Sequence, residues 1–142
     1  CDAAPHAGQL EAVELVERLV DRVGADVDTL NFMAFALAER KLRPDDARAF
    51  AWRAALLEPL SGYILDTLGW AELAAGDAEA AVVTLRRADR LAPGEGEIWF
   101  HIAAAELARG QRELAGGAVA IALSLLPATD PLRARAAALI GE

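Results

Sequence analysis

The sequence predicts an all-α solenoid, in which antiparallel helix pairs stack one after another. The pattern of large, small and helix-breaking residues over 62–95 recurs over 96–129, and a fixed period of about 34 residues is typical of solenoids. Glycine or proline interrupts the chain about every 15–18 residues, the length of one helix and its turn. Aromatic residues make up only 6% of the chain and β-branched residues are also few, which disfavours a sheet.

The first stretch of the chain predicts half of a repeat. Residues 1–8 are mostly small or polar and are expected to form an N-terminal tail. Residues 9–24 are expected to contain the second helix of a partial repeat, with Ala12, Val16 and Leu19 on its buried stripe. The sequence shows no counterpart of that repeat's first helix.

The first full repeat is expected at 27–61, with helices at 27–40 and 45–57. Leu30 precedes its counterpart Leu65 by 35 positions, whereas Ala47 precedes Ala81 by 34. The turn between the two helices has therefore gained one residue.

The second full repeat is expected at 62–95, with helices at 62–75 and 78–91. Gly69 marks a place where a side chain would hold a neighbouring helix away. Gly76 ends the first helix, where a positive φ costs least. Asp77 places a carboxylate at the positive end of the next helix, and Pro93 stops that helix.

The third full repeat and a closing segment complete a single predicted domain over 1–142. Residues 96–129 predict helices at 96–109 and 112–125, with Gly110 and Pro127 repeating the punctuation. Residues 130–142 are expected to form a C-terminal cap, with a helix at 130–140.

This unit resembles the tetratricopeptide repeat, a helix–turn–helix unit of the same length. Trp99, Ala115 and Pro127 stand where that family has an aromatic residue, the alanine of the second helix and the closing proline. The family's usual tyrosine is replaced by Glu72 and Glu106, and by Leu37 in the first repeat. We expect a glutamate at this place to reach an arginine such as Arg86 or Arg112.

The resemblance implies a concave groove, lined by the first helices, that binds a peptide or a partner helix. Independently, Tyr63, Asp66, Trp70 and Leu73 are spaced to share one helix face. The alternative is that the aromatic rings are core residues. The expected partner-binding residues are Asp28, Asn31, Phe35, Tyr63, Asp66, Trp70, Leu73, Glu97, Phe100 and His101.

The net charge either serves solubility alone or favours a basic partner. The chain has 22 acidic and 14 basic residues, a net charge of −8, which disfavours nucleic acid and anionic membranes. No stretch is apolar and long enough to predict a membrane span. Aromatic rings beside carboxylates suit an apolar segment carrying lysine or arginine. Acidic residues at Asp28, Asp66 and Glu97 argue against the carboxylate clamp of chaperone-binding relatives.

Nothing in the sequence predicts catalysis, a cofactor or a metal site. His6 and His101 are far apart and stand without other likely ligands at a recognisable spacing. The chain is therefore predicted to be no enzyme. Trp52 lies at an exposed place on a second helix, either beneath the partial repeat or in a self-association patch.

The expected function is a protein-binding adaptor, and its alanine-rich, arginine-over-lysine composition indicates a bacterial source. Envelope assembly, secretion and polysaccharide export are the processes suggested by analogy, and a homo-oligomerising scaffold is the alternative. Cys1 resembles the lipidated start of a bacterial lipoprotein, the alternative being an artificial boundary within a longer array. The predicted location is the bacterial cytoplasm, or the periplasm or envelope if Cys1 is lipidated.

Overall fold

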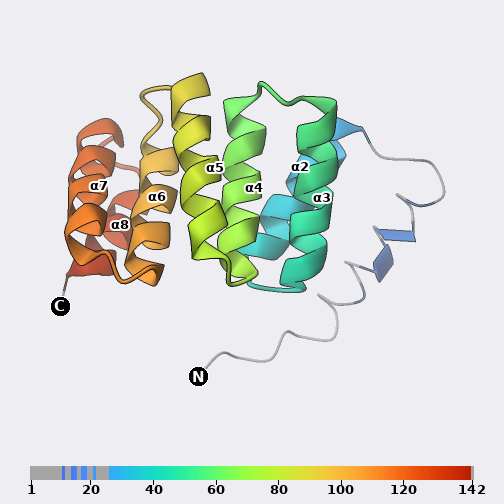
Figure 1. Cartoon of the computed structure of the whole chain (residues 1–142), viewed down its shortest axis with the longest axis horizontal. Coiled ribbons are helices and arrows are strands. Elements are labelled where there is room, and N and C mark those ends of the chain that lie inside the picture. Colours follow the sequence, from blue (N-terminus) through green and yellow to red (C-terminus); the bar gives the residue numbers. More distant parts are fainter. Residues whose placement is uncertain (1–10, 12–13, 16, 19–20, 22–25, 142) are drawn as a thin grey trace.

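The computed structural model describes residues 26–141, together with positions 11, 14, 15, 17, 18 and 21. Every regular element in this part of the chain is a helix, as predicted (Figure 1). Cys1, the predicted tail 1–8 and much of the predicted helix within 9–24 lie outside the described residues. The helices are α2 (Val27–Glu39), α3 (Pro44–Leu57), α4 (Gly62–Ala74), α5 (Ala78–Leu91), α6 (Gly96–Ala108), α7 (Arg112–Leu125) and α8 (Leu132–Ile140).

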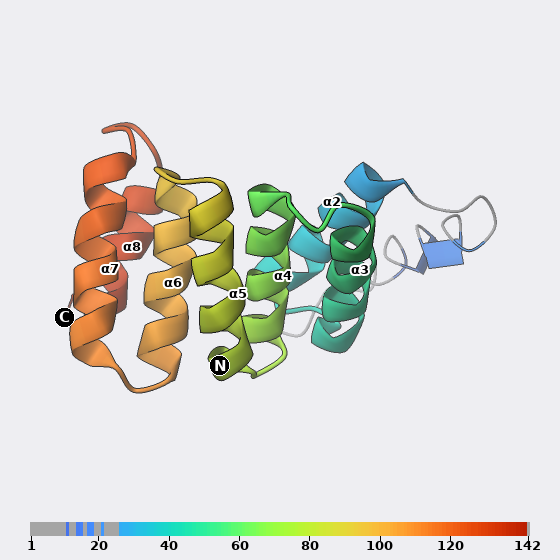
Figure 2. The ribbon, with the colours of Figure 1, turned by 45° about the horizontal axis from the view of Figure 1, so that its top comes forward.

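The helices stack along the long axis of the molecule in two layers (Figures 1 and 2). Within the inner layer α2 packs on α4, α4 on α6 and α6 on α8, whereas α3, α5 and α7 of the outer layer do not pack on one another. The inner helices are therefore closer together, so their layer lies on the concave side of the stack. None of the described helices is long and apolar enough to cross a bilayer.

The helix boundaries follow from local chemistry. Asp26, Ser61 and Asp77 cap α2, α4 and α5, and each side-chain oxygen accepts a hydrogen bond from a backbone N–H three residues on. Gly76 and Gly110 have φ values of 89° and 78°, which confirms the predicted left-handed helix ends.

The longer turn of the first repeat has the unusual backbone that an extra residue requires. Lys41 and Arg43, at φ values of 52° and 47°, both occupy the left-handed region that residues other than glycine rarely adopt. Arg43 forms ion pairs with Glu17 at 2.7 Å and Asp46 at 2.6 Å, and these contacts hold the turn.

Small residues let the helices of a pair approach closely. A Cβ atom on Gly69 would lie 2.5 Å from Cγ of Leu85, which confirms the predicted close contact. At the starts of α4 and α6, Gly62 and Gly96 likewise allow close contact, with Ala92 and Leu126 respectively. The core is accordingly dominated by alanine and leucine.

Glu106 confirms one expectation and corrects another. Its carboxylate lies 3.3 Å from the guanidinium of Arg86, the contact predicted in place of the family tyrosine. The other candidate partner, Arg112, meets no glutamate among the described residues, and its guanidinium donates instead to the carbonyl of Ile140 at 3.0 Å. That contact joins α7 to the end of α8.

Candidate functional site: the concave groove

A hollow of about 600 Å³ lies on the concave face and receives residues from α2, α4, α6 and α8. Alanines form much of its lining, because small side chains on the inner helices leave the space unfilled. Two aromatic rings and three charged side chains complete it. The lining residues are Ala38, Glu39, Lys41, Trp70, Leu73, Ala74, Phe100, Ala104, Ala108, Arg135, Ala138 and Leu139.

The aromatic wall of the hollow is built from α4 and α6. The Trp70 ring stacks on the His101 ring, with centroids 4.1 Å apart and an interplanar angle of 25°. The Phe100 ring lies 5.8 Å from that of Trp70 and 5.4 Å from that of His101. Phe100 is only 2% exposed, so this ring serves the core as well as the groove.

Behind Trp70 lies a buried polar group that the sequence did not reveal. Nδ1 of His101 is 2.7 Å from Oδ1 of Asp66, a hydrogen-bond distance between two buried side chains. Nε2 of the same ring is 4.0 Å from Oε1 of Glu97. His101 was expected to stand alone; the helix packing of α4 on α6 corrects this by bringing the two carboxylates to it.

The electrostatics of this polar group are dominated by burial. Burial raises the pKa of Glu97 above its ordinary value, and the nearby Asp66 carboxylate raises it further, while His101 opposes the shift. Asp66, Glu97 and His101 each offer one possible metal-ligand atom, and these three atoms lie within 4.8 Å of one another. Among the described residues, this is the group whose geometry could hold a metal ion. The short His101–Asp66 contact satisfies both groups as a hydrogen bond.

An ion pair crosses the hollow from its first helix to its last. The Glu39 carboxylate on α2 is 2.6 Å from the guanidinium of Arg135 on α8. The other oxygen of Glu39 accepts a hydrogen bond of 2.9 Å from the indole N–H of Trp70. Arg135 also lies over the Phe100 ring, 5.0 Å from its centroid. Arg135 thus occupies the groove as a basic ligand side chain would.

The structure gathers only part of the predicted site. Asp66, Trp70, Leu73, Glu97, Phe100 and His101 lie in or directly behind the hollow. Asp28, Asn31, Phe35 and Tyr63 do not line it. Tyr63 is 61% exposed and its hydroxyl donates to Glu95 at 3.0 Å, beyond the groove.

The three charged residues of the groove, Glu39, Lys41 and Arg135, were missed. The repeat itself contains a signal for Glu39, because Glu39, Ala74 and Ala108 are equivalent positions and all three line the hollow. Arg135 has no such signal. It lies on α8, which the repeat pattern identifies only as a closing helix, and its side chain reaches the first repeat through the curvature of the whole stack.

Two layers of paired helices around an inner groove define a helical-repeat protein with a fold of the tetratricopeptide type. No protein-family model and no curated protein matches the chain. Solved structures do match it, at sequence identities that carry the fold alone.

Three of these structures illustrate the match. The Yersinia enterocolitica type III secretion chaperone SycD, in complex with a peptide of the translocator YopD, is 20% identical with a TM-score of 0.66, covering 80% of this chain and 88% of that chain. PcrH in complex with the chaperone binding region of PopD is 24% identical with a TM-score of 0.68, over 82% and 92% of the two chains. MamA is 22% identical with a TM-score of 0.70, over 92% and 73%.

Proposed function

We propose that this chain is a non-catalytic adaptor that binds an apolar segment of a partner protein in its concave groove. The observation that carries the proposal is the hollow of about 600 Å³ between Trp70, Phe100 and a lining of alanines. This volume lies within the range of about 300–1,000 Å³ typical of binding pockets. SycD, which shares the fold, binds a peptide of the translocator YopD, and PcrH binds the chaperone binding region of PopD, which supports a peptide as the ligand.

The partner segment is proposed to carry lysine or arginine. Asp66 is only 7% exposed and lies on His101, so little of its carboxylate is accessible to a ligand. The carboxylate that a ligand can use is Glu39, whose present partner is the half-exposed Arg135. A basic residue of the ligand would replace Arg135 on Glu39 while an apolar neighbour fills the space beside Trp70.

Secretion is the cellular process to test first, since SycD, which shares the fold, is a type III secretion chaperone. Envelope assembly and polysaccharide export rest on analogy with the family alone.

The test is a selection of phage-displayed 16-residue peptides on the chain, followed by titration of the selected peptides. Ala108→Trp fills the hollow from the exposed end of α6 and is expected to weaken binding at least tenfold. Ala120→Trp, on an exposed position of α7 that does not line the hollow, is the matched control. We expect the selected sequences to combine large apolar residues with lysine or arginine.

Trp70→Ala tests the aromatic wall and is expected to cost about 2 kcal/mol of binding free energy, as central aromatic residues typically do. Circular dichroism must first show that this variant is folded, because Trp70 also packs on His101. Peptides that bind Ala108→Trp and folded Trp70→Ala as tightly as the unsubstituted chain would place their site elsewhere. Light scattering of the chain alone tests the scaffold alternative, which requires mass to rise with concentration.

A further inference from the structure

The ion pair between Glu39 and Arg135 joins two helices that do not otherwise pack on each other. Glu39 lies on α2, the first described helix of the inner layer, and Arg135 lies on α8, the last. The closing helix α8 packs on α6 and α7, and not on α2. Stacking of the helices therefore does not account for this contact, which two side chains make across the open face of the groove.

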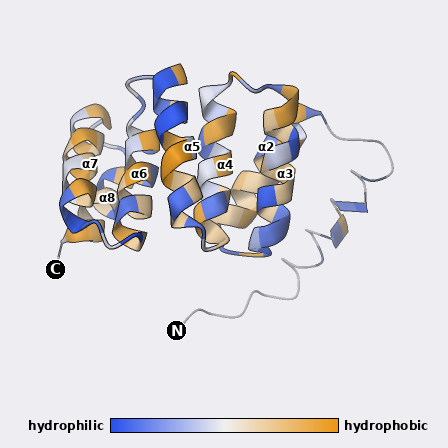
Figure 3. Ribbon diagram, viewed as in Figure 1, coloured by the Kyte–Doolittle hydropathy of each residue, from blue (hydrophilic) through white to orange (hydrophobic). Residues whose placement is uncertain are grey.

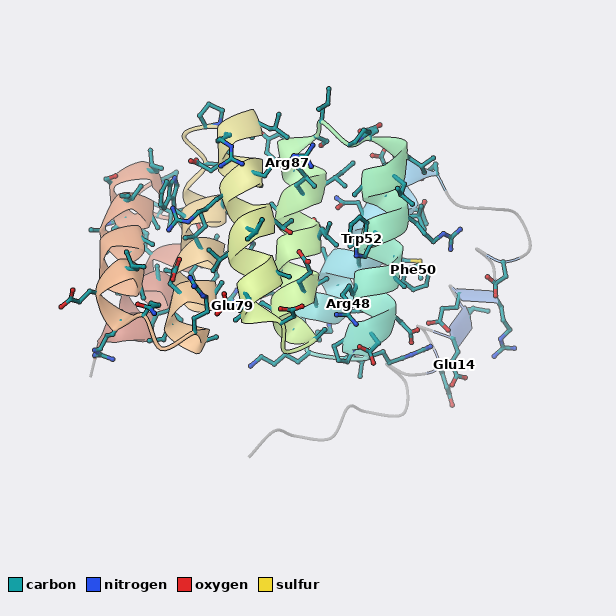
Figure 4. All side chains as sticks on the ribbon, in the orientation of Figure 1. Glu14, Arg48, Phe50, Trp52, Glu79 and Arg87 are labelled. Atoms are coloured by element: carbon teal, nitrogen blue, oxygen red, sulfur yellow. The ribbon has the colours of Figure 1, made fainter. Side chains whose placement is uncertain are left out.

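The ion pairs of the outer layer are local by comparison. Arg48 pairs with Asp45 on the same helix, at 3.5 Å. Glu79 on α5 pairs with Arg109 at the end of the adjacent α6, at 3.1 Å. Figure 4 shows Arg48 and Glu79 on the outer helices α3 and α5, and Figure 3 shows α5 with a hydrophobic middle between hydrophilic ends. The pair across the groove instead joins the first described repeat to the last helix.

Arg135 covers both features of the groove that a basic, apolar ligand requires. Its guanidinium lies 2.6 Å from one oxygen of Glu39, while the other oxygen accepts the indole N–H of Trp70 at 2.9 Å. The same guanidinium lies over the Phe100 ring, 5.0 Å from its centroid. A side chain of the protein itself therefore holds the carboxylate and shields part of the aromatic wall.

The other charges of the groove make Glu39 the carboxylate that a ligand must win. The charged residues that line the hollow are Glu39, Lys41 and Arg135. Lys41 forms no ion pair with another described residue. Asp66 and Glu97 do not line the hollow and lie behind it. A basic segment that enters must therefore take Glu39 from Arg135, against the added charge of Lys41.

The closing helix keeps its place without the help of Arg135. Near its start, Arg133 donates to two backbone carbonyls at the end of α7, at 2.6 Å and 2.9 Å. At its end, the carbonyl of Ile140 accepts a hydrogen bond of 3.0 Å from Arg112. The Arg135 side chain is 48% exposed, so it can turn into solvent while the backbone of α8 stays on α7.

We propose that Arg135 is a built-in competitor, which holds the place of the ligand's basic residue and so selects the segments that bind. This inference rests on the proposed function, because it concerns the same groove and the same carboxylate. A segment binds when its own lysine or arginine takes over Glu39 and its apolar neighbour displaces Arg135 from the Phe100 ring. The apparent affinity falls with the fraction of chains in which the competitor is in place, so poorly matching segments are excluded.

Fluorescence anisotropy of a labelled peptide measures the competition. The probe is Ser-Gly-Leu-Phe-Arg-Leu-Gly-Ser, and its control has glutamine in place of arginine. Arg135→Gln is expected to bind the probe at least threefold more tightly than the unsubstituted chain, because Glu39 is then free. The glutamine peptide is expected to gain less, since it has no positive charge to place on Glu39.

Lys41→Gln is the matched control for Arg135→Gln. It removes a positive charge from the same lining without freeing Glu39, so it is expected to change the affinity for the probe less than twofold. In a Glu39→Gln background, Arg135→Gln is likewise expected to have less than a twofold effect, because the contested carboxylate is absent. Lys41 and Arg135 are both exposed, so their variants are expected to fold, and circular dichroism checks this.

Nuclear magnetic resonance tests whether the competitor is in place before any peptide is added. The indole N–H of Trp70 is bonded to Glu39, and that of Trp99 is bonded to Asp89. Arg135→Gln is expected to move the Trp70 signal and to leave the Trp99 signal in place. An unmoved Trp70 signal would overturn the proposal, because Glu39 would not then hold Arg135 in solution.

The binding results separate a failure of this inference from a failure of the groove. Binding of the probe that Ala108→Trp does not weaken contradicts the groove as the site, and the competitor with it. Binding that Ala108→Trp blocks but Arg135→Gln weakens or leaves unchanged contradicts the competitor alone, since Arg135 would then be an ordinary part of the site. Equal gains from Lys41→Gln and Arg135→Gln would also overturn it, by assigning the effect to overall charge.

Discussion

Glu72 and Glu106 occupy equivalent positions in the second and third repeats but have opposite surroundings. Both are buried, at 6% and 1% exposure. The Glu106 carboxylate contacts Arg86 at 3.3 Å and Arg109 at 3.0 Å. Oε1 of Glu72 has no hydrogen-bond partner within the described part of the chain. Burial raises the pKa of this carboxyl, although Thr84 and Arg48 act to lower it.

The sequence explains the difference between the two repeats. The residues that stand 34 positions before Arg86 and Arg109 are Trp52 and Ala75, and neither carries the positive charge that an ion pair with Glu72 requires. The same fold therefore accommodates a buried glutamate either as part of an ion-pair network or as a group that burial drives toward its protonated form. Trp52 stands at the position from which, one repeat later, Arg86 contacts Glu106.

The largest expected effect is the loss of the Glu106 network. Glu106→Gln keeps the shape of the side chain but removes the charge that Arg86 and Arg109 share. We expect the free energy of unfolding at pH 7 to fall by about 2 kcal/mol, since hydrogen bonds to charged groups contribute about 1.5–3 kcal/mol. Urea denaturation followed by circular dichroism measures this.

Glu72→Gln is the matched control for that measurement. This substitution removes a poorly compensated buried charge, so stability at pH 7 is expected to stay the same or rise. An equal loss of stability in both variants would mean that the two repeats treat their glutamates alike, and the comparison would fail.

A smaller effect is expected from the close contact at Gly69, whose equivalent in the third repeat is Ala103. Gly69→Leu forces side-chain atoms into Leu85, and overpacking of this kind costs about 1–3 kcal/mol. Replacing glycine within a helix regains up to about 1 kcal/mol of helix propensity, so a net loss is expected.

Differential scanning calorimetry of Gly69→Leu beside Ala103→Gly checks this prediction. Ala103→Gly removes a buried methyl group and is expected to destabilise through the opposite change in volume. A higher melting temperature for Gly69→Leu would show that α4 and α5 have room at this contact.

The fold was predictable because each helix end has its own local signal. Prolines, capping residues and glycines at helix ends placed all seven described helices within about two residues of their bounds, and the 34-residue period paired them. The contact of Glu106 with Arg86 was also predictable, since the second helix of one repeat packs on the first helix of the next and brings these positions together.

The groove was only partly predictable, because its shape depends on how the whole stack curves. Helix periodicity correctly grouped Asp66, Trp70 and Leu73, which lie on one face of one helix. The same periodicity included Tyr63, and the family resemblance added Asp28, but neither of these residues lines the hollow. Asp66 lies behind the hollow, on His101. The pairing of Glu39 with Arg135 joins the first described repeat to the last helix, and no local pattern encodes a contact over that distance in sequence.

The smallest expected effect is the pH dependence that Glu72 gives to stability. The pKa of Glu72 in the folded chain lies above the ordinary value of 4.5. Between 4.5 and the folded pKa, the folded state therefore binds more protons than the unfolded state. The favourable contribution is complete below pH 4.5 and is lost as pH rises through the folded pKa. Stability of the unsubstituted chain should therefore fall from pH 4.5 to 7 relative to Glu72→Gln.

Urea titrations of the two proteins at a series of pH values measure this difference. Glu97, whose pKa is also raised by burial, titrates in both and cancels from the comparison. Ala75→Arg gives Glu72 an arginine at the position equivalent to Arg109, which pairs with Glu106. Because this arginine favours the charged carboxylate, the variant is expected to show a smaller change of stability with pH. The free energies of unfolding of the unsubstituted chain and of Glu72→Gln could instead differ by a constant amount from pH 4.5 to 7. That result would mean that the Glu72 carboxylate is already compensated in the folded state. The contrast between the repeats would then rest on the arginines of Glu106 alone.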